Sequence, residues 1–411
     1  MSKKRHSATD TPLPDAFIEE MKRQLGAEET ALLVEELGRE PSVSIRLNWR
    51  KVKDIAGFMR RFEEYGVSPV EWCESGFYLD RRPDFIHDPL LHAGVYYVQE
   101  AASMVYESIV RDLPFRPRRV LDLCAAPGGK STAMLNALEG AYILVANEVE
   151  RSRARILKEN LDKWGDPSVI VTSSPADRFG RMEGYFDLVA VDAPCSGEGM
   201  MRREPVARSQ WSPMLVEQCS RLQRDILADA IEALADGGCL IYSTCTFNTL
   251  ENEANVEWLR DELGLTPIGE PRHFMPHRER CEGLFVAVFQ KPGAPHPILP
   301  ETSLKDAEKA LRRAGVNILG VGTEKTVMKG DVEILSSRQV LACDYDPAAF
   351  PSAPLGREEA VAYLRRNAIT LPPDVPKGYV AVSYEGFPLG LVKNLGNRAN
   401  NLYPAEWRVL T

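Results

Sequence analysis

One stretch constrains the fold of this chain more than any other: Val120-Leu-Asp-Leu-Cys-Ala-Ala-Pro-Gly-Gly-Lys-Ser-Thr132. A short apolar run reaches Asp122, a tight turn follows at Pro127-Gly-Gly129, and a helix-forming segment then opens. This succession of strand, glycine turn and helix is typical of the first unit of a parallel α/β sheet. Glycines let the backbone approach a ligand closely, and the start of a helix offers unpaired N–H groups to it.

Four kinds of turn have this layout, and the spacing argues against two of them. A phosphate-binding Walker loop needs a glycine five residues before Gly129, where this chain has Cys124. A dinucleotide fingerprint needs G-x-G-x-x-G, but only the pair Gly128-Gly129 is present. An ordinary β–α turn stays open. A nucleoside-cofactor site is favoured by Glu148, which ends the next strand-like run, because an acidic residue about 20 residues past the glycines can bind ribose hydroxyls.

The middle of the chain alternates strand-like and helix-like segments, which predicts an α/β fold with a doubly wound sheet. Predicted strands cover 119–124, 142–147, 168–172, 186–192, 238–243 and 284–290. Predicted helices between them cover 129–138, 150–164, 214–235 and 249–261.

The flanking regions predict two further domains. Residues 1–112 form a small α+β N-terminal domain, with helices at 15–25, 28–37 and 54–65 and a strand at 43–49. Its last part, 88–112, is expected to be a loop that leads into a packed helix, because Val98, Ala101, Ala102 and Val105 recur at helical spacing. Residues 113–292 form the central domain, and 293–411 form a proline-rich linker and a β-rich C-terminal region.

Composition narrows the class of protein. A chain of 411 residues can hold two or three domains, and its net charge of −9 argues mildly against a nucleic-acid partner unless basic residues cluster locally. The eight cysteines contain no C-x-x-C pair and are interpreted as free thiols, and no metal site is expected. No apolar run has transmembrane length and the start lacks a secretory signal, so a cytoplasmic protein without a membrane partner is expected.

Two cysteines follow neighbouring predicted strands. The fourth strand runs into Asp192-Ala-Pro-Cys195, and the fifth runs into Ser243-Thr-Cys245. The carboxyl ends of parallel strands meet at the ligand-binding edge, so these groups should lie near the glycine turn. Free cysteine is often a small buried hydrophobe, which is the interpretation preferred for Cys219, Cys239 and Cys343.

Paired thiols beside a carboxylate suit methylation of cytosine at C5, a carbon that is a poor nucleophile. A thiolate that adds to C6 makes C5 an enamine carbon able to attack a sulfonium methyl group. A second thiol could assist elimination, and Asp192 could stabilise the adduct near N3 of the ring. The spacing leaves open which cysteine plays which role.

The sequence resembles the Sun-type RNA cytosine-C5 methyltransferases over about 88–291. The resemblance rests on Asp122-Leu-Cys-Ala-Ala-Pro-Gly-Gly-Lys130, Asp192-Ala-Pro-Cys-Ser-Gly197 and Ser243-Thr-Cys-Thr246. It also covers Asn147-Glu148, Asp177 before Arg178-Phe179, and the segment Gln99-Glu-Ala-Ala-Ser103.

This resemblance implies a Rossmann-like core that binds S-adenosyl-L-methionine. The implied cofactor-binding residues are Cys124, Ala125, Ala126, Pro127, Gly128, Gly129, Lys130, Glu148, Asp177 and Asp192. Cys245 is implied as the nucleophile and Cys195 as the residue that helps to release product. The layout resembles the bacterial branch that acts on small-subunit (16S) ribosomal RNA, with an RNA-binding N-terminal domain and a C-terminal domain similar to a PUA RNA-binding module. The expected partner is therefore RNA, either ribosomal RNA or the small subunit, bound by a monomer.

Alternative functions stay open at this stage. A tRNA cytosine-C5 methyltransferase shares the chemistry. A DNA cytosine-C5 methyltransferase would use the Pro-Cys thiol, Cys195, as nucleophile and would have no need of Cys245. A non-catalytic ribosome-assembly factor would have no use for paired thiols.

Two further side-chain positions are predicted. Lys130 is expected near the cofactor or Asp192, with a solvent-facing position as the alternative. Arg202 and Arg203 are expected either to contact RNA phosphate or to lie on a solvated face.

Overall fold

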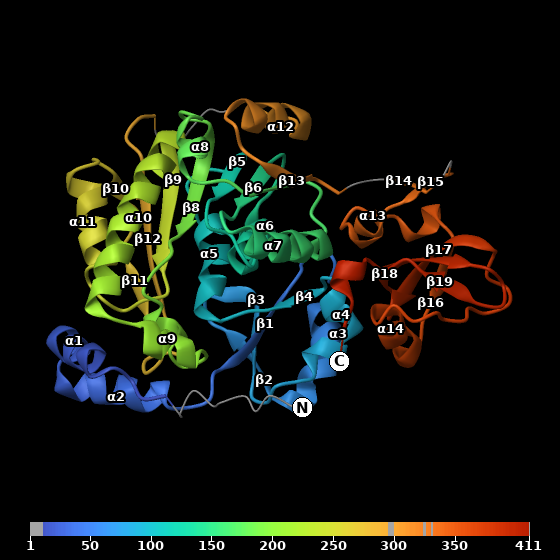
Figure 1. Ribbon diagram of the computed structural model, residues 1–411, viewed down its shortest axis with the longest axis horizontal. Coiled ribbons are helices and arrows are strands. Elements are labelled where there is room, and N and C mark those ends of the chain that lie inside the picture. Colours follow the sequence, from blue (N-terminus) through green and yellow to red (C-terminus); the bar gives the residue numbers. More distant parts are fainter. Residues whose placement is uncertain (1–10, 295–299, 324–325, 330–331, 411) are drawn as a thin grey trace.

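The computed structural model describes residues 11–294, 300–323, 326–329 and 332–410 (Figure 1). Residues 1–10 of the predicted N-terminal domain and 295–299 of the predicted linker lie outside the described residues. Within the described part, no helix is long and apolar enough to cross a membrane.

A mixed sheet forms the middle of the molecule, and within the described residues it has nine strands. Its order is β10-β12-β9-β8-β5-β6-β7-β13, with β11 paired to β12. The bounds are β5 Arg119–Asp122, β6 Ile143–Asn147, β7 Val169–Thr172, β8 Phe186–Asp192, β9 Leu234–Thr244, β10 Thr266–Pro267, β11 Arg272–Phe274, β12 Leu284–Gln290 and β13 Ile318–Val321. All six predicted strands are present, and β9 starts four residues earlier than 238. The chain leaves β5 toward β6 and later returns to β8 on its other side, and such a switch point is where open α/β sheets bind ligands.

The central strands β6, β7 and β8 are buried on both faces, which is why their sequences are almost continuously apolar. Val120 faces one core and Leu121 the other, as the alternation of side chains in a strand requires. One face packs against α5 Val105–Arg111, α6 Gly129–Ala137 and α7 Arg151–Trp164. The other face packs against α8 Asp177–Gly180, α10 Pro213–Ala233, α11 Glu253–Asp261 and α12 Leu304–Arg313.

The N-terminal region has two parts that lie apart (Figure 1). A hairpin of α1 Asp15–Leu25 and α2 Ala27–Leu37 packs against Met201, Trp211 and Phe247, next to α9 Pro205–Gln210. The second part is an antiparallel sheet in the order β2-β3-β1-β4. Its elements are β1 Val43–Leu47, α3 Ile55–Met59, η2 Arg60–Tyr65, β2 Val67–Val70, β3 Cys73–Leu79, η3 Phe85–His87, α4 Pro89–His92 and β4 Tyr96–Val98.

The expected helical packing of Val98 is wrong. Val98 ends strand β4, where it pairs with Ile45 of β1, and the helix that follows starts only at Val105 after the short turn η4 Ala102–Met104. Aromatic and β-branched residues before Gln99 favour a strand, and pairing with β1 decides between the two periodicities.

The C-terminal domain is a small sheet in the order β16-β17-β18-β19. Its elements are β14 Thr326–Lys329, β15 Val332–Leu335, α13 Ser337–Leu341, η6 Pro347–Ala349, β16 Ser352–Pro354, α14 Arg357–Leu364, β17 Gly378–Tyr384, β18 Phe387–Asn394, β19 Ala399–Asn401 and η7 Ala405–Trp407. Before it, α12 and β13 pack on the central sheet, and β13 runs antiparallel to β7.

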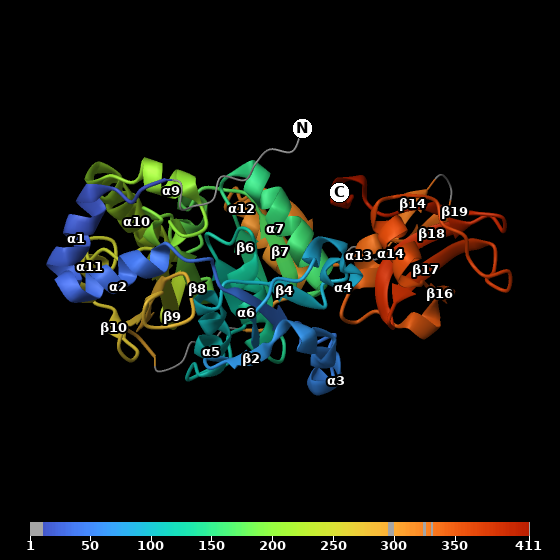
Figure 2. The same cartoon turned by 90° about the horizontal axis from the view of Figure 1, so that it is seen from below.

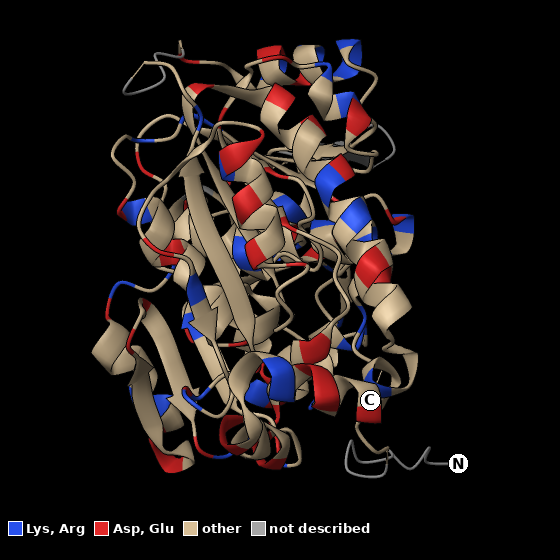
Figure 3. Cartoon of the chain, turned by 90° about the vertical axis from the view of Figure 1, so that its left-hand side faces the viewer, with Lys and Arg blue, Asp and Glu red and all other residues tan. Residues whose placement is uncertain are grey.

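The C-terminal sheet and the N-terminal sheet domain share one hydrophobic core. At their contact Phe58 meets Phe387 edge-on, with ring centroids 6.2 Å apart. Seen from below, the α1–α2 hairpin and the C-terminal domain lie at opposite ends of the molecule (Figure 2). Basic and acidic residues are interspersed over the face of the molecule at the hairpin end (Figure 3).

Candidate active site

Helix α7 holds the glycine turn between β5 and α6 through hydrogen bonds to its backbone. Gly128 has φ 110°, a left-handed conformation that favours glycine, and its N–H donates to Ala125 O at 2.8 Å. The turn's carbonyls accept from α7: Arg153 donates to Ala126 O at 3.0 Å and Asn160 to Pro127 O at 2.8 Å. The turn therefore presents its other side to the crevice.

A cavity lies at that side, above the carboxyl ends of β5 and β8. The residues that border it are Tyr97, Val98, Gln99, Glu100, Ser103, Cys124, Ala125, Ala126, Pro127, Gly129, Lys130, Asp192 and Arg203. The cavity thus brings together most of the residues predicted to hold the cofactor.

Glu148 and Asp177 do not border this cavity but stand at the same sheet edge. Glu148 follows β6, is buried, and accepts from Glu150 N at 2.9 Å with Arg153 Nη1 3.3 Å away. Asp177 begins α8 after β7, is half exposed, and pairs with Arg181 at 2.9 Å. Both carboxylates therefore lie one or two strands further along the sheet than the glycine turn.

Asp192 at the end of β8 is fixed by two neighbours. Lys130 Nζ lies 2.8 Å from Asp192 Oδ2, and Ser243 donates to Oδ1 at 2.7 Å. Tyr106 OH in turn lies 2.8 Å from Ser243 Oγ. Burial alone would lower the pKa of Lys130, but Asp192 raises it above its usual value. The prediction that Lys130 lies beside Asp192 is confirmed, and the solvent-facing alternative is wrong.

Cys195 and Cys245 are brought together although 50 residues separate them, with their Sγ atoms 3.2 Å apart. The hydrogen bond with Cys245 and burial raise the pKa of Cys195 well above its usual value, so Cys195 stays a neutral thiol. Cys239 lies in the core of the sheet, as expected of a small hydrophobe, whereas Cys219 and Cys343 are only partly buried. All eight cysteines lie in the described part of the chain, and each is free.

Two buried carboxylates join the loops that carry these thiols, and neither was predicted from the sequence. Glu198 of η5 Glu198–Met200 accepts from Phe247 N at 2.6 Å and Asn248 N at 3.0 Å, in the loop after Cys245. Glu251 accepts from Ser196 N at 3.0 Å, in the loop after Cys195. A carboxylate between two glycines, as in Gly197-Glu-Gly199, was the available sequence signal.

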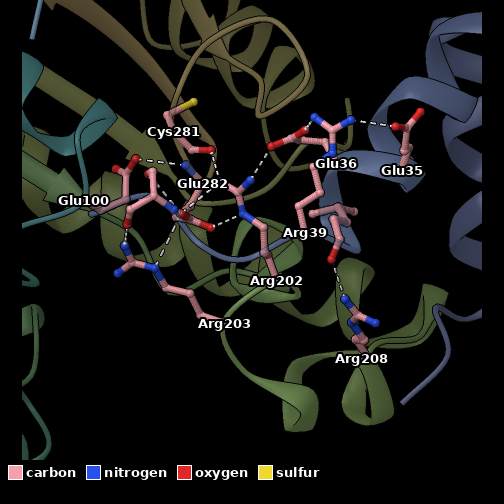
Figure 4. Close-up of polar contacts among 11 residues, drawn as sticks. Glu35, Glu36, Arg39, Glu100, Arg202, Arg203, Arg208, Cys281 and Glu282 are labelled. Carbon is pink, nitrogen blue, oxygen red and sulfur yellow. Dashed lines mark hydrogen bonds and ion pairs between the residues drawn. The ribbon is translucent and has the colours of Figure 1, made fainter. Parts of the chain in front are cut away.

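Arg202 is neither a phosphate ligand nor part of a solvated face, so both predicted positions are wrong for this residue. It is 3% exposed and donates to Glu282 Oε2 at 2.6 Å and to Glu36 of α2 at 2.8 Å (Figure 4). A guanidinium is buried only when its donors are paired, and these partners come from segments far away in sequence. Arg203, in contrast, is partly exposed and borders the cavity.

In the described part of the chain, no group of three or more His, Cys, Asp or Glu side chains is arranged to hold a metal ion. The cavity instead offers backbone from the glycine turn and the carboxylates of Glu100 and Asp192. These groups fit a ligand that carries sulfonium and ammonium charges together with an adenosine, as S-adenosylmethionine does.

Comparison with known proteins supports this assignment. Residues 114–290 match the family described as 16S rRNA methyltransferase RsmB/F, and residues 13–101 match the N-terminal domain of 16S rRNA methyltransferase RsmF. A ribosomal RNA small subunit methyltransferase F from Klebsiella pneumoniae is 32% identical, with 88% of this chain and 89% of the relative covered. One from Salmonella paratyphi B is 31% identical, with 96% of each chain covered.

The chain belongs to the RsmB/F family of 16S rRNA methyltransferases. It is therefore an RNA methyltransferase that uses S-adenosyl-L-methionine, as predicted. Residues 350–409 match the RsmF PUA domain, so the PUA-like C-terminal domain is confirmed as well.

Solved structures agree with this family fold. A methyltransferase homologue from Pyrococcus horikoshii is 26% identical, with a TM-score of 0.58, and 68% of this chain and 100% of that chain are covered. NSun6 from the same organism, solved with SFG, is 21% identical with a TM-score of 0.57, and the match covers 68% of this chain and 98% of that one. The similarity to NSun6 shows only that the two proteins share a fold.

Proposed function

We propose that this RsmB/F-family protein forms 5-methylcytosine in small-subunit ribosomal RNA through a covalent adduct with Cys245. The observation that carries the proposal is the pair of thiols, with Sγ atoms 3.2 Å apart, at the sheet edge that holds Asp192 and the glycine turn. Methylation of a nitrogen or of a ribose oxygen needs no thiol. The names of the relatives, which are small-subunit methyltransferases, favour ribosomal RNA over tRNA.

In the proposed reaction the Cys245 thiol gives up its proton to solvent, the thiolate adds to C6 of cytosine, and the C5–C6 π electron pair becomes available at C5. Asp192 is assigned to the N3 and N4 edge of the base, where its carboxyl group can accept from the exocyclic amine or share a proton with N3. Lys130 and Ser243 hold that carboxyl group in place. S-adenosylmethionine supplies the electrophilic methyl group that C5 attacks.

Release then requires loss of the C5 proton to a base and return of the C6–S electron pair to Cys245. Cys195 is suited to assist because its raised pKa keeps the thiol protonated next to the departing sulfur. It can donate a proton to the Cys245 thiolate as that sulfur leaves. The cofactor is assigned to residues 124–130 with Glu148, Asp177 and Asp192.

The decisive experiment compares Cys195→Ala with Cys245→Ala on host ribosomal RNA, tRNA and immature small subunits. With Cys195→Ala we expect a protein–RNA adduct that survives a denaturing gel, because addition proceeds while release is slowed. With Cys245→Ala we expect no adduct and no methyl transfer. Cys219→Ala is the matched control, because Cys219 lies on α10, outside the residues that border the cavity, and should leave activity unchanged.

Other outcomes separate the alternatives. Methyl transfer that survives Cys245→Ala but not Cys195→Ala would contradict the proposed assignment. Cys195 would then be the nucleophile, as in the DNA cytosine-C5 methyltransferases. Sequencing of the trapped RNA names the target nucleotide, and a tRNA there would favour the runner-up substrate. Failure of the wild type to methylate any of these RNAs would favour an assembly factor.

We also propose that the protein acts in the cytoplasm and is a monomer. Light scattering should then give a mass of 45.9 kDa.

A further inference from the structure

Gln99, Glu100 and Ser103 border the cavity, yet the reaction described so far uses none of their side chains. Gln99 follows β4 of the N-terminal sheet and is 6% exposed. It is therefore a residue of the N-terminal region that reaches the border of the methyltransferase site.

The orientation of its side-chain amide is determined by Arg46. Arg46 Nε donates to Gln99 Oε1 at 2.7 Å, and a guanidinium is a donor only, so the amide oxygen must face Arg46. Arg46 is itself fully buried in β1, donates to Thr132 O of α6 at 3.1 Å, and stacks over the Trp164 ring at 4.7 Å. The NH₂ group of Gln99 is thus held on the side away from Arg46.

That NH₂ group, Nε2, is buried and has no hydrogen-bond partner among the described residues. It lies against Gly129, where an added Cβ would be 3.4 Å from it. Gly129 begins the nine-residue helix α6, whose first N–H groups lack partners within the helix and carry partial positive charge. The unpaired donor Gln99 Nε2 and the N-terminus of α6 lie at the same place, and together they make a site for an anionic oxygen.

The carboxylates that border the cavity do not accept a hydrogen bond from Gln99 Nε2. Glu100 accepts from Ala102 N, Ser103 N and Glu282 N at 2.9, 2.8 and 3.0 Å. Asp192 is engaged by Lys130 and Ser243. The described residues thus leave Gln99 Nε2 without an acceptor, and a ligand in the cavity can supply one.

We propose that Gln99 Nε2 binds the methionine carboxylate of S-adenosylmethionine, with Arg46 as the positioning residue that prevents the amide from flipping. Of the cofactor's parts, only the carboxylate is an anion. Glu148, which suits the ribose hydroxyls, and Asp177, also assigned to the cofactor, stand after β6 and β7 on the far side of the glycine turn. The proposal rests on methyl transfer from this cofactor but not on which RNA atom accepts the methyl group.

The test is a calorimetric measurement of ligand affinity without RNA, which is independent of catalysis. The probes are S-adenosylhomocysteine, its carboxamide, and 5′-methylthioadenosine, which lacks the amino-acid end. Gln99→Leu should weaken S-adenosylhomocysteine about tenfold, because a hydrogen bond to a charged group is lost, and should leave methylthioadenosine unchanged. The matched control is Gln218→Leu on the exposed side of α10, which should change neither affinity.

A second variant keeps the test decisive if Gln99→Leu folds poorly. Gln99→Glu retains the size and the pairing with Arg46 but replaces the donor with an acceptor, so it should prefer the carboxamide, whereas wild type prefers the carboxylate. Unchanged affinity for S-adenosylhomocysteine in both variants would overturn the proposal, as would an equal loss for methylthioadenosine. A selective loss of RNA affinity would also overturn it, because the amide would then face the substrate base. None of these outcomes bears on the thiol roles.

Discussion

Asp122 ends β5 with its carboxyl group fully inside the protein, where Ser131 donates to Oδ2 at 2.6 Å. Burial raises its pKa from 3.8 to about 7, and the hydrogen bond from Ser131 offsets only part of this effect. A carboxylate is costly to bury, so this residue makes folding depend on pH.

The sign follows from proton binding. Between pH 4 and pH 7 the folded chain holds a proton on Asp122 that the unfolded chain has lost, so raising the pH lowers the free energy of unfolding. We expect Asp122→Asn to remove this dependence. Its stability relative to wild type should rise between pH 4 and pH 7 by at most about 4 kcal/mol, at about 1.4 kcal/mol for each of about three pKa units. Urea unfolding at several pH values measures this, with exposed Asp112→Asn as control, and a pH-independent difference would contradict it.

At the scale of elements, the active site depends on the relative position of two loops, one after β8 and one after β9. Glu198 is the bridge: its two oxygens accept from Phe247 N, Asn248 N and Trp211 Nε1, all of which are donors. A glutamine in this place would turn an NH₂ group toward donors, whichever way its amide points.

We therefore expect Glu198→Gln to lower the free energy of unfolding by about 1–3 kcal/mol. In a Cys195→Ala background it should also slow adduct formation at least tenfold, because Cys245 moves relative to the cavity. Samples quenched at intervals and run on denaturing gels measure the rate of adduct formation. Glu217→Gln on the exposed face of α10 serves as the control. Adduct formation at the unaltered rate would mean that the bridge does not position the thiols.

At the scale of the whole molecule, the N-terminal sheet domain and the C-terminal PUA domain are joined by a shared core. Besides the Phe58–Phe387 contact, Arg61 pairs with Glu385 at 2.8 Å, and Lys163 of α7 lies over the Trp407 ring at 5.4 Å. The PUA domain is thereby fixed to the side of the molecule opposite the α1–α2 hairpin (Figure 2).

A shared core predicts coupled unfolding. Phe387→Ala should lower the free energy of unfolding by about 2–3 kcal/mol, less than a fully buried phenylalanine because the ring is partly exposed. Calorimetry should show the N-terminal and C-terminal domains shifting together to lower temperature. The control Leu395→Ala, at an exposed site, should leave the transition in place. A C-terminal transition that shifts alone would show that the two domains unfold independently.

Much of the fold could be predicted because its signals are local. The strands β5 to β8, β12 and the second half of β9 are mostly apolar runs, and α6, α7 and α10 end within a few residues of their predicted bounds. Where two periodicities competed, as at Val98, only the pairing with Ile45 decided between helix and strand. In the N-terminal region no catalytic or binding side chain was predicted by local pattern, although Gln99 borders the cavity from there and Arg46 holds its amide.

The sequence by itself determined the alternation of strand and helix, the glycine turn, and the arrival of Asp192, Cys195 and Cys245 at one sheet edge, because each depends on residues adjacent in the chain. The tertiary structure alone decided the rest. The 3.2 Å between the thiols, the burial of Arg202 against Glu36 and Glu282, and the orientation of the Gln99 amide depend on partners up to 166 residues away in the chain. A buried polar group is defined by the groups that satisfy it, and those groups are found only when the chain has folded.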